Sequence, residues 1–354
     1  MEPVRLDPKQ RRLEILAAII ESYVESGEPI ASGAVARMLG NSVSSATLRN
    51  DMASLADGGY LTQPHTSAGR IPTQRGYRMY VDRLMHLRTL PEDIMRHIDI
   101  QLTACSMDPE RFLTEAARML SGMIGMTTIF THPASDNARL LGVELMPTGR
   151  RTCLLMLMIS PSMLRTRLCR LEVDLTEETL EGMRRILRTA MCGKQLSEIN
   201  HRLVSFVREQ LGAMGDVIEP LLIAIRDAAR SGERTRVVLG GQEHLLEPSA
   251  FSDRGVRDIL AFLSDREQIA EMMRRLSGTI NVFIGTESNH SALSEASLIT
   301  ARYSSGNGAT GWIGVLGPQR MHYSRIIPCV QYFATAIGRL LSAVESDEQD
   351  IGGF

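Results

Sequence analysis

Residues 42–73, SVSSATLRNDMASLADGGYLTQPHTSAGRIPT, constrain the fold of this chain more than any other segment. Ser44 is placed to cap a helix, because its hydroxyl can accept a hydrogen bond from the first turn. Leu48, Met52 and Leu55 then recur at helical spacing and would pack on earlier helices. Two consecutive glycines end this helix. The segment therefore predicts a short amphipathic helix whose second face points away from the core and is available for binding.

A hairpin should follow that helix. Tyr60–Gln63 and Arg70–Pro72 can pair as two short strands, with Ser67-Ala68-Gly69 near the tip. Apolar spacing predicts two helices upstream, over residues 9–26 and from a possible Ser32 cap to residue 40. Three helices followed by a hairpin are the order of a winged helix-turn-helix, in which the third helix enters the major groove of DNA.

The expected DNA contacts lie at the start of the third helix and on the hairpin. Serine hydroxyls and helix-start amides bind phosphates, whereas Asn suits adenine and Arg suits guanine. An arginine in the hairpin could enter the minor groove or hold a phosphate. The candidate DNA-binding residues are Ser44, Ser45, Thr47, Arg49, Asn50, His65 and Arg70.

Two other interpretations of these residues stay open. A winged helix can bind protein instead of DNA. His65 could bind a metal, but no second ligand lies at a workable spacing, so a structural hydrogen bond or a phosphate contact is favoured. We expect no metal site.

Charge favours DNA over protein as the target. Residues 31–90 contain seven arginines and three aspartates, a balance of +4, whereas the whole chain carries −2. The remainder therefore sums to −6. A basic module on an acidic body is typical of a DNA-binding unit joined to a regulatory one.

The whole chain suits two or three domains, because 354 residues exceed one ordinary core. Thr73 should cap a fourth helix over 74–90, and Pro91 marks a domain boundary. Strands are expected at both ends of a mainly helical stretch, and one sheet with a helical insertion explains this best. The expected helices are 92–105, 109–124, 176–232, 253–277 and 320–344, and the expected strands are 139–147, 152–160, 163–173, 237–241, 280–285, 296–303 and 311–317.

Other functional classes receive little support. The five cysteines are scattered and form no metal spacing, and no signal peptide or membrane span is evident, so we expect a cytoplasmic protein. The GxGxxG-like fragments near residues 306–317 lie before and within a strand, which argues against dinucleotide binding. No nucleophile–base pair stands out, so we expect neither an enzyme nor a cofactor. A regulator with a small-molecule effector remains the alternative.

Two blocks of sequence resemble the HrcA family of heat-inducible transcription repressors. The first is GEPIAS (27–32) with SSATLRNDMASLADGGYLTQPHTSAGRIPTQRGYRMYVD (44–82), and its PHTSAGRIPT string is highly specific. The second comprises VFIGTE (282–287), ASLITARY (296–303) and GWIGVLGPQRMHYSRII (311–327). The resemblance extends along almost the whole chain but is weak in 175–275. The chain departs from the family pattern at His322 and Ala56, where acidic residues are usual.

The resemblance implies an α+β multidomain protein. Its parts are a winged helix (1–90), a GAF-like α/β domain (91–175 and 276–345), a dimerising domain inserted within it (176–275) and a flexible tail (346–354). It also implies a homodimer that represses chaperone operons by binding double-stranded DNA at an inverted-repeat operator called CIRCE. The family's partner is the chaperonin, which keeps the repressor active until heat-unfolded proteins occupy it.

Overall fold

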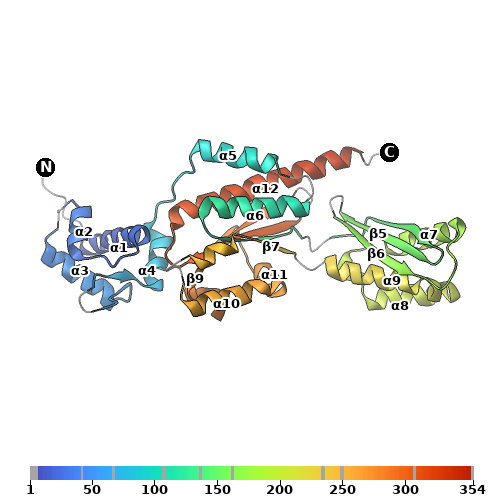
Figure 1. Cartoon of the computed structure of the whole chain (residues 1–354), viewed down its shortest axis with the longest axis horizontal. Helices are drawn as coiled ribbons and strands as arrows, with labels where there is room; N and C mark the ends of the chain where they lie inside the picture. Colours follow the sequence, from blue (N-terminus) through green and yellow to red (C-terminus); the bar gives the residue numbers. More distant parts are fainter. Residues whose placement is uncertain are drawn as a thin grey trace.

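The structure is a computed structural model of a mixed α/β chain that contains several sheets. It describes residues 7–40, 43–65, 68–105, 109–134, 138–160, 163–232, 236–247, 251–305 and 308–351. Figure 1 shows three bodies along the long axis of the molecule: an N-terminal unit at one end, a central unit, and a third unit, called the inserted unit, at the other end.

The N-terminal unit is helical with one small hairpin. Its core is formed by apolar residues at helical spacing, among them Ile15, Leu16 and Leu48, which are fully buried. The elements are α1 (Pro8–Ser26), α2 (Ser32–Met38), α3 (Ser45–Asp57), β1 (Leu61–Thr62), β2 (Ile71–Pro72), α4 (Gln74–Met79) and a π-helical turn, η1 (Tyr80–Leu84).

Two details of the N-terminal unit differ from the sequence prediction. The residue at the N-cap of α2 is Ala31, not Ser32, and it makes no side-chain cap. The fourth helix ends at Leu84 rather than at 90, because Met85 turns to extended backbone. The segment beyond it lies against the last helix of the chain, where the Arg88 amide donates to the Ser324 carbonyl at 3.1 Å.

The central unit is a five-stranded antiparallel sheet with helices on both faces. Its strand order is β7-β3-β10-β9-β8. Neighbouring residues of one strand face opposite sides: Ile313 packs beneath α6 and α12, whereas Trp312 packs against α10 and α11. The elements are α5 (Glu92–Thr103), α6 (Pro109–Ile124), β3 (Thr127–Thr131), β7 (Val237–Gly240), η3 (Gln242–Leu246), α10 (Asp253–Ser264), α11 (Arg266–Arg274), β8 (Ile280–Ile284), η4 (Gly285–Ser288), η5 (Ser291–Leu293), β9 (Ala296–Ser304), β10 (Thr310–Pro318) and α12 (Tyr323–Ile351).

Helix α12 is the longest in the described chain and is apolar enough, by length and composition, to span a membrane over Tyr323–Ala343. Half of that window is buried, and Val330, Phe333 and Ile337 are fully enclosed in the core beside the central sheet. The helix is therefore the core helix of this unit. It extends past the predicted end at 344 and covers much of the segment expected to be a flexible tail.

The inserted unit has its own sheet and its own core. Three antiparallel strands in the order β4-β5-β6 are covered on one face by helices that share a separate hydrophobic cluster. The elements are β4 (Gly142–Gly149), β5 (Thr152–Ser160), β6 (Met163–Arg170), α7 (Glu177–Met191), η2 (Leu196–Glu198), α8 (His201–Leu211) and α9 (Ala213–Gly232).

The prediction of one interrupted sheet is therefore wrong. Strands β4–β6 do not pair with the central strands, and β3, which completes the central sheet, was not predicted. Helices α10 and α11, assigned from the sequence to the insertion, pack on the central sheet. The reason is that β5 carries apolar residues on both faces, as a doubly covered central strand would, although only one of its faces is covered by helices.

Candidate nucleic-acid interface

Helix α3 begins as the sequence predicts. The Ser44 hydroxyl accepts a hydrogen bond from the Thr47 amide at 3.2 Å and lies 2.9 Å from the Thr47 hydroxyl. This cap satisfies one of the amides that a helix start leaves without a partner. Leu48, Met52 and Leu55 are buried, so the helix is fixed to the unit along one face.

The opposite face of α3 is open. Arg49 and Asn50 are exposed in its second turn, and the rest of the face carries small side chains and, at its C-terminal end, Asp57. Small side chains let a helix backbone approach a groove closely, while the two long ones can reach base edges. The exposed residues of α3 are Ser45, Ala46, Arg49, Asn50, Ala53, Ser54 and Asp57.

An acidic residue of α3 is neutralised within the fold. Asp51 is 7% exposed, and its carboxylate accepts from Arg11 Nε of α1 at 2.8 Å. Arg12 Nε lies 4.0 Å from the same group. The hydrogen bond to Asp51 raises the pKa of Arg11, which stays charged. Asp51 therefore anchors α3 to α1. Its ion pair was not predicted, although Asp51 falls on the buried side of the 48–52–55 spacing.

The hairpin is attached to the helices through its backbone. Strands β1 and β2 pair antiparallel, and Ile30 exchanges two backbone hydrogen bonds of 2.9 Å with Arg70. A Cβ added at Gly69 would lie 2.4 Å from the carbonyl carbon of Ile30. Only glycine lets the two backbones approach this closely, which explains the glycine in the SAGR sequence.

A second attachment joins the hairpin to the end of α3. Gly59 has a φ of +74°, and its carbonyl accepts from the Thr73 hydroxyl at 2.6 Å. The same hydroxyl caps α4 by accepting from the Gly76 amide at 3.1 Å. The Arg75 guanidinium lies 4.8 Å from the ring centroid of Tyr60. Helix α3, the hairpin and α4 therefore form one connected body.

The predicted site residues fall into two groups at the same end of the molecule (Figure 1). Ser44, Ser45, Thr47, Arg49 and Asn50 lie together at the start of α3, and all but the half-buried Thr47 are exposed. The exposure of Arg49 and Asn50 agrees with the predicted 48–52–55 spacing, whereas contact of these five residues with DNA stays a prediction.

The hairpin residues divide differently. His65 is exposed, whereas Arg70 is half-buried and donates from Nη1 to Gln63 Oε1 at 2.5 Å. Gln63 in turn donates to the Ala68 carbonyl at 2.8 Å. Arg70 thus supports the hairpin itself, and its contact with DNA stays a prediction. Residues 66 and 67 lie outside the described residues.

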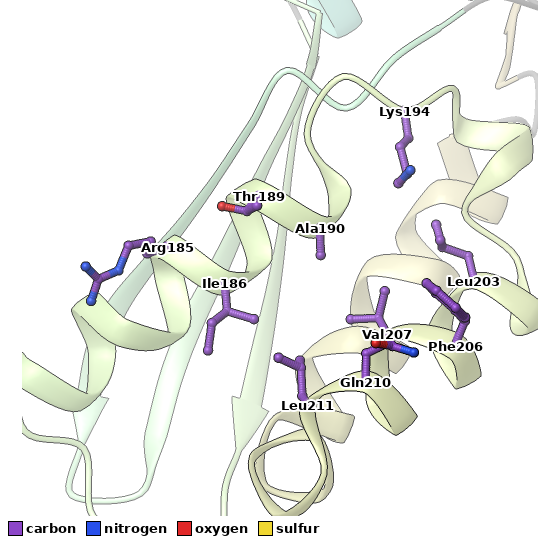
Figure 2. Close-up of a pocket in the computed structure, with 10 residues that line it drawn as sticks. All are labelled: Arg185, Ile186, Thr189, Ala190, Lys194, Leu203, Phe206, Val207, Gln210 and Leu211. Carbon is purple, nitrogen blue, oxygen red and sulfur yellow. The ribbon is translucent and has the colours of Figure 1, made fainter.

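Two cavities lie away from this end. Figure 2 shows an apolar groove of about 540 Å³ between α7 and α8, with Phe206 in its wall and Arg185 and Lys194 among its lining residues. A cavity of about 180 Å³ beside the central sheet is lined in part by His244, Glu247 and Arg320. Pockets for small ligands usually measure about 300–1,000 Å³. The cavity of about 180 Å³ beside the central sheet is smaller than this range, so its size gives no support to a small-molecule effector in the central unit.

Metal ligands do not cluster in the part of the chain that the structure describes: no group of three or more His, Cys, Asp or Glu side chains is arranged to hold an ion. His65 accordingly belongs to no such group among the described residues.

Comparisons with known proteins agree on one family. Residues 110–327 match the family model described as "HrcA protein C terminal domain". A protein from Geobacter sulfurreducens named heat-inducible transcription repressor HrcA is 31% identical, over 95% of this chain and 98% of its own length. A protein of the same name from Kineococcus radiotolerans is 32% identical, over 94% and 99%.

One solved structure, described as a hypothetical protein, has a similar fold. It aligns with a TM-score of 0.59 at 22% identity, over 94% of this chain and 98% of its own. At this identity the likeness concerns the fold alone, and it extends across all three units.

Proposed function

Because this chain belongs to the HrcA family of heat-inducible transcription repressors, we propose that it represses heat-shock genes by binding DNA through its N-terminal unit. The observation that carries the proposal is the exposed face of α3, where Arg49 and Asn50 project from a helix whose other side is fixed to the core. The N-terminal unit then acts as a winged helix, with α3 in the major groove and the hairpin as the wing.

Each predicted contact has a distinct task in this proposal. Arg49 and Asn50 read base edges, while Ser44, Ser45 and Thr47 hold phosphates near the helix start. His65, on the exposed part of the wing, contacts a phosphate of the DNA backbone. Arg70 holds the wing in shape and reaches DNA only if its bond to Gln63 opens.

The protein acts as a homodimer on an inverted repeat, the CIRCE operator. The support is an apolar surface on the inserted unit. The outer face of its sheet is not covered by helices, and Leu164 and Leu168 are 60% and 70% exposed beside Met146 (50%) and Met158 (42%). A contiguous apolar face of this kind typically marks an interface. A two-fold dimer formed there would match the symmetry of an inverted repeat.

The chaperonin is the proposed partner that keeps the repressor in its DNA-binding form. When heat-unfolded proteins occupy the chaperonin, the active fraction of repressor falls and the operons are transcribed. A chaperone can set that fraction only if the active state is more stable than the inactive state by no more than a few kcal/mol.

The central unit serves as a GAF-like domain that connects the other two units. The insertion spans about 138–232, according to its separate hydrophobic core. We assign no catalytic role and a cytoplasmic location.

One titration tests this proposal. Duplex DNA carrying the inverted repeat upstream of a chaperonin operon is titrated in gel shifts at physiological salt, with and without chaperonin. Arg49→Ala should weaken binding by about 1–3 kcal/mol, roughly 5- to 150-fold, relative to scrambled DNA. Arg257→Ala in α10, an equally exposed arginine away from α3, is the matched control and should change nothing. If the wild-type protein binds the operator no better than scrambled DNA with chaperonin present, the proposal is wrong.

A further inference from the structure

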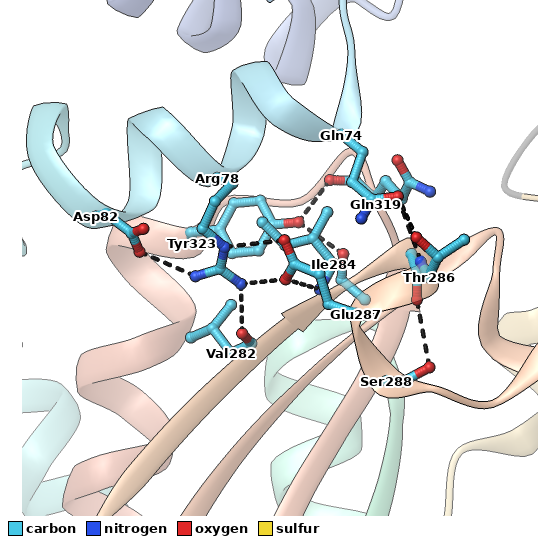
Figure 3. Close-up of polar contacts among 12 residues, drawn as sticks. Gln74, Arg78, Asp82, Val282, Ile284, Thr286, Glu287, Ser288, Gln319 and Tyr323 are labelled. Carbon is cyan, nitrogen blue, oxygen red and sulfur yellow. Dashed lines mark hydrogen bonds and ion pairs between the residues drawn. The ribbon is translucent and has the colours of Figure 1, made fainter.

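A group of hydrogen bonds joins the N-terminal unit to the central unit (Figure 3). Arg78 of α4 donates from Nε to Glu287 Oε1 at 3.0 Å, and its Nη2 pairs with the other carboxylate oxygen. The same Nη2 donates to the Val282 carbonyl at 2.5 Å. Gln74, one turn earlier in α4, accepts from the Thr286 amide at 3.3 Å and from its hydroxyl at 3.2 Å. We call Gln74, Arg78, Thr286 and Glu287 the latch.

The two halves of the latch are each fixed within their own unit. Glu287 accepts from the Ile284 amide at 2.9 Å, at the end of β8. Arg78 also donates to Asp82, one turn along its own helix, at 2.9 Å. A bidentate Arg–carboxylate pair fixes direction as well as distance. Because each end is also bonded within its own unit, Glu287 to a backbone amide and Arg78 to a side chain, the latch defines the angle between α4 and the central sheet.

The surrounding contacts cannot define that angle equally well. Tyr77 packs on Tyr323 with ring centroids 6.1 Å apart, and both side chains are buried in a core shared by the two units. Apolar burial is non-directional, so it holds the units together while permitting rotation. The latch side chains are about 29% exposed at Arg78 and 28% at Glu287. Pairs of this kind contribute specificity of arrangement more than net stability.

The latch controls the position of α3 because α4 and α3 form one body. Thr73 caps α4 and is bonded to Gly59 at the end of α3. Helices α3 and α4 are joined through the hairpin and do not pack closely on each other. Their separation therefore exceeds the roughly 10 Å of packed helices, so a rotation of about 20° at α4 moves α3 by roughly 3.5 Å or more. One base pair advances a DNA site by about 3.4 Å. A small change at the latch therefore corresponds to a one-base-pair change in the distance between two recognition helices.

We propose that the latch is a positioning device that sets the half-site spacing accepted by the repressor dimer. This rests on the proposed function, because spacing has meaning only for a dimer bound to an inverted repeat. Arg78 and Glu287 act through α3 and do not touch DNA. Their loss should leave the affinity of one N-terminal unit for one half-site unchanged and should relax the choice among spacings.

The experiment compares duplexes whose spacer between half-sites is natural, or longer or shorter by one and two base pairs, with a duplex carrying a single half-site. Wild-type protein should bind the duplex with the natural spacing about tenfold or more tightly than a duplex whose spacing differs by one base pair. Glu287→Gln, which keeps the shape but removes the charge, should reduce that preference to about threefold or less. Asp174→Asn is the matched control, because it removes the ion pairs that Asp174 forms with Arg150 and with Arg151 within the inserted unit. This variant should keep the wild-type spacing preference.

Thr286→Val is the second variant, since it removes the hydroxyl bond to Gln74 from an exposed position and threatens folding least. It should lower the spacing preference in the same direction by a smaller factor. If wild type prefers one spacing and both latch variants keep that preference, the latch proposal is overturned while the proposed function stands. If wild type binds no duplex specifically, both proposals fall. A uniform loss of affinity at every spacing, with the preference kept, also overturns the latch proposal.

Discussion

Replacing Gly69 with alanine tests whether the wing depends on the close approach of two backbones. The new Cβ would lie 2.4, 2.5 and 2.7 Å from the carbonyl carbon, oxygen and nitrogen of Ile30, none of which belongs to a flexible side chain. The strand must therefore move away and lose both 2.9 Å hydrogen bonds between Ile30 and Arg70. Two backbone bonds contribute about 0.5–1.5 kcal/mol each, and overpacking costs about 1–3 kcal/mol.

These terms sum to a local destabilisation of about 2–6 kcal/mol for Gly69→Ala. Hydrogen exchange measured by mass spectrometry is the suitable assay, because it reports opening of the hairpin in the full-length chain without requiring two-state unfolding. Each 1.4 kcal/mol is a factor of ten, so the amides of Ile30 and Arg70 should exchange at least about 30-fold faster than in wild type, and up to roughly 20,000-fold faster. Operator affinity should fall with the loss of the ordered wing.

A matched glycine provides the control. Gly33 lies in α2 of the same unit, and an added Cβ meets nothing within 4 Å. Gly33→Ala should be neutral, or stabilising by up to about 1 kcal/mol through helix propensity, with unchanged exchange in the hairpin. If Gly69→Ala also leaves the exchange of these amides within about threefold of wild type, the argument from close approach is refuted.

Three other perturbations follow from contacts in the structure. Asp51→Ala should destabilise the N-terminal unit by about 1–3 kcal/mol because it leaves the partly buried Arg11 without its carboxylate; an unchanged melting transition in calorimetry would contradict this. Leu168→Glu should convert the dimer to monomer in analytical ultracentrifugation, whereas Leu246→Glu, at 69% exposure against 70%, should not; equal masses for the two variants would exclude this face. The unfolding free energy of wild type should exceed that of Glu287→Gln by a constant amount from about pH 8 to 5. This difference should decrease below about pH 4, as urea titrations at each pH would measure.

The sign of the last prediction follows from the pKa of Glu287. Burial alone would raise this pKa, but hydrogen bonds from Arg78 and from the Ile284 amide outweigh it and leave the pKa below its usual value. A carboxylate with a lowered pKa in the folded state contributes stability above its unfolded pKa, and the contribution is lost as pH falls through the folded value. If wild type and Glu287→Gln had the same unfolding free energy near pH 7, the ion pair could not be the origin of the effect.

The features that the sequence predicted correctly depend on nearby residues. The Ser44 cap, the 48–52–55 apolar spacing and the Thr73 cap each involve residues within a few positions of one another, and all are present. The exposed group at the start of α3 follows directly from that spacing. Local hydrogen bonding and helical periodicity therefore suffice to predict the candidate DNA surface.

The errors concern partners that are distant in sequence. Strand β3 was missed because TTIFT is short and its five buried residues show no alternation. The two sheets were merged because β5 is apolar on both faces, a pattern that does not reveal whether helices cover one face or both. The ion pair of Asp51 was not predicted because its partner, Arg11, lies forty positions earlier.

The latch shows why the two blocks of family-like sequence belong to one device. Arg78 lies in the first block and Glu287 in the second, 209 positions away. DNA binding by an isolated winged helix would require only the first block. The pairing of the two blocks across the boundary between units instead agrees with the proposal that the central unit fixes the orientation of α3. Under that proposal regulation can act at a distance from DNA, because a change that displaces η4 from α4 frees α3 from its fixed orientation.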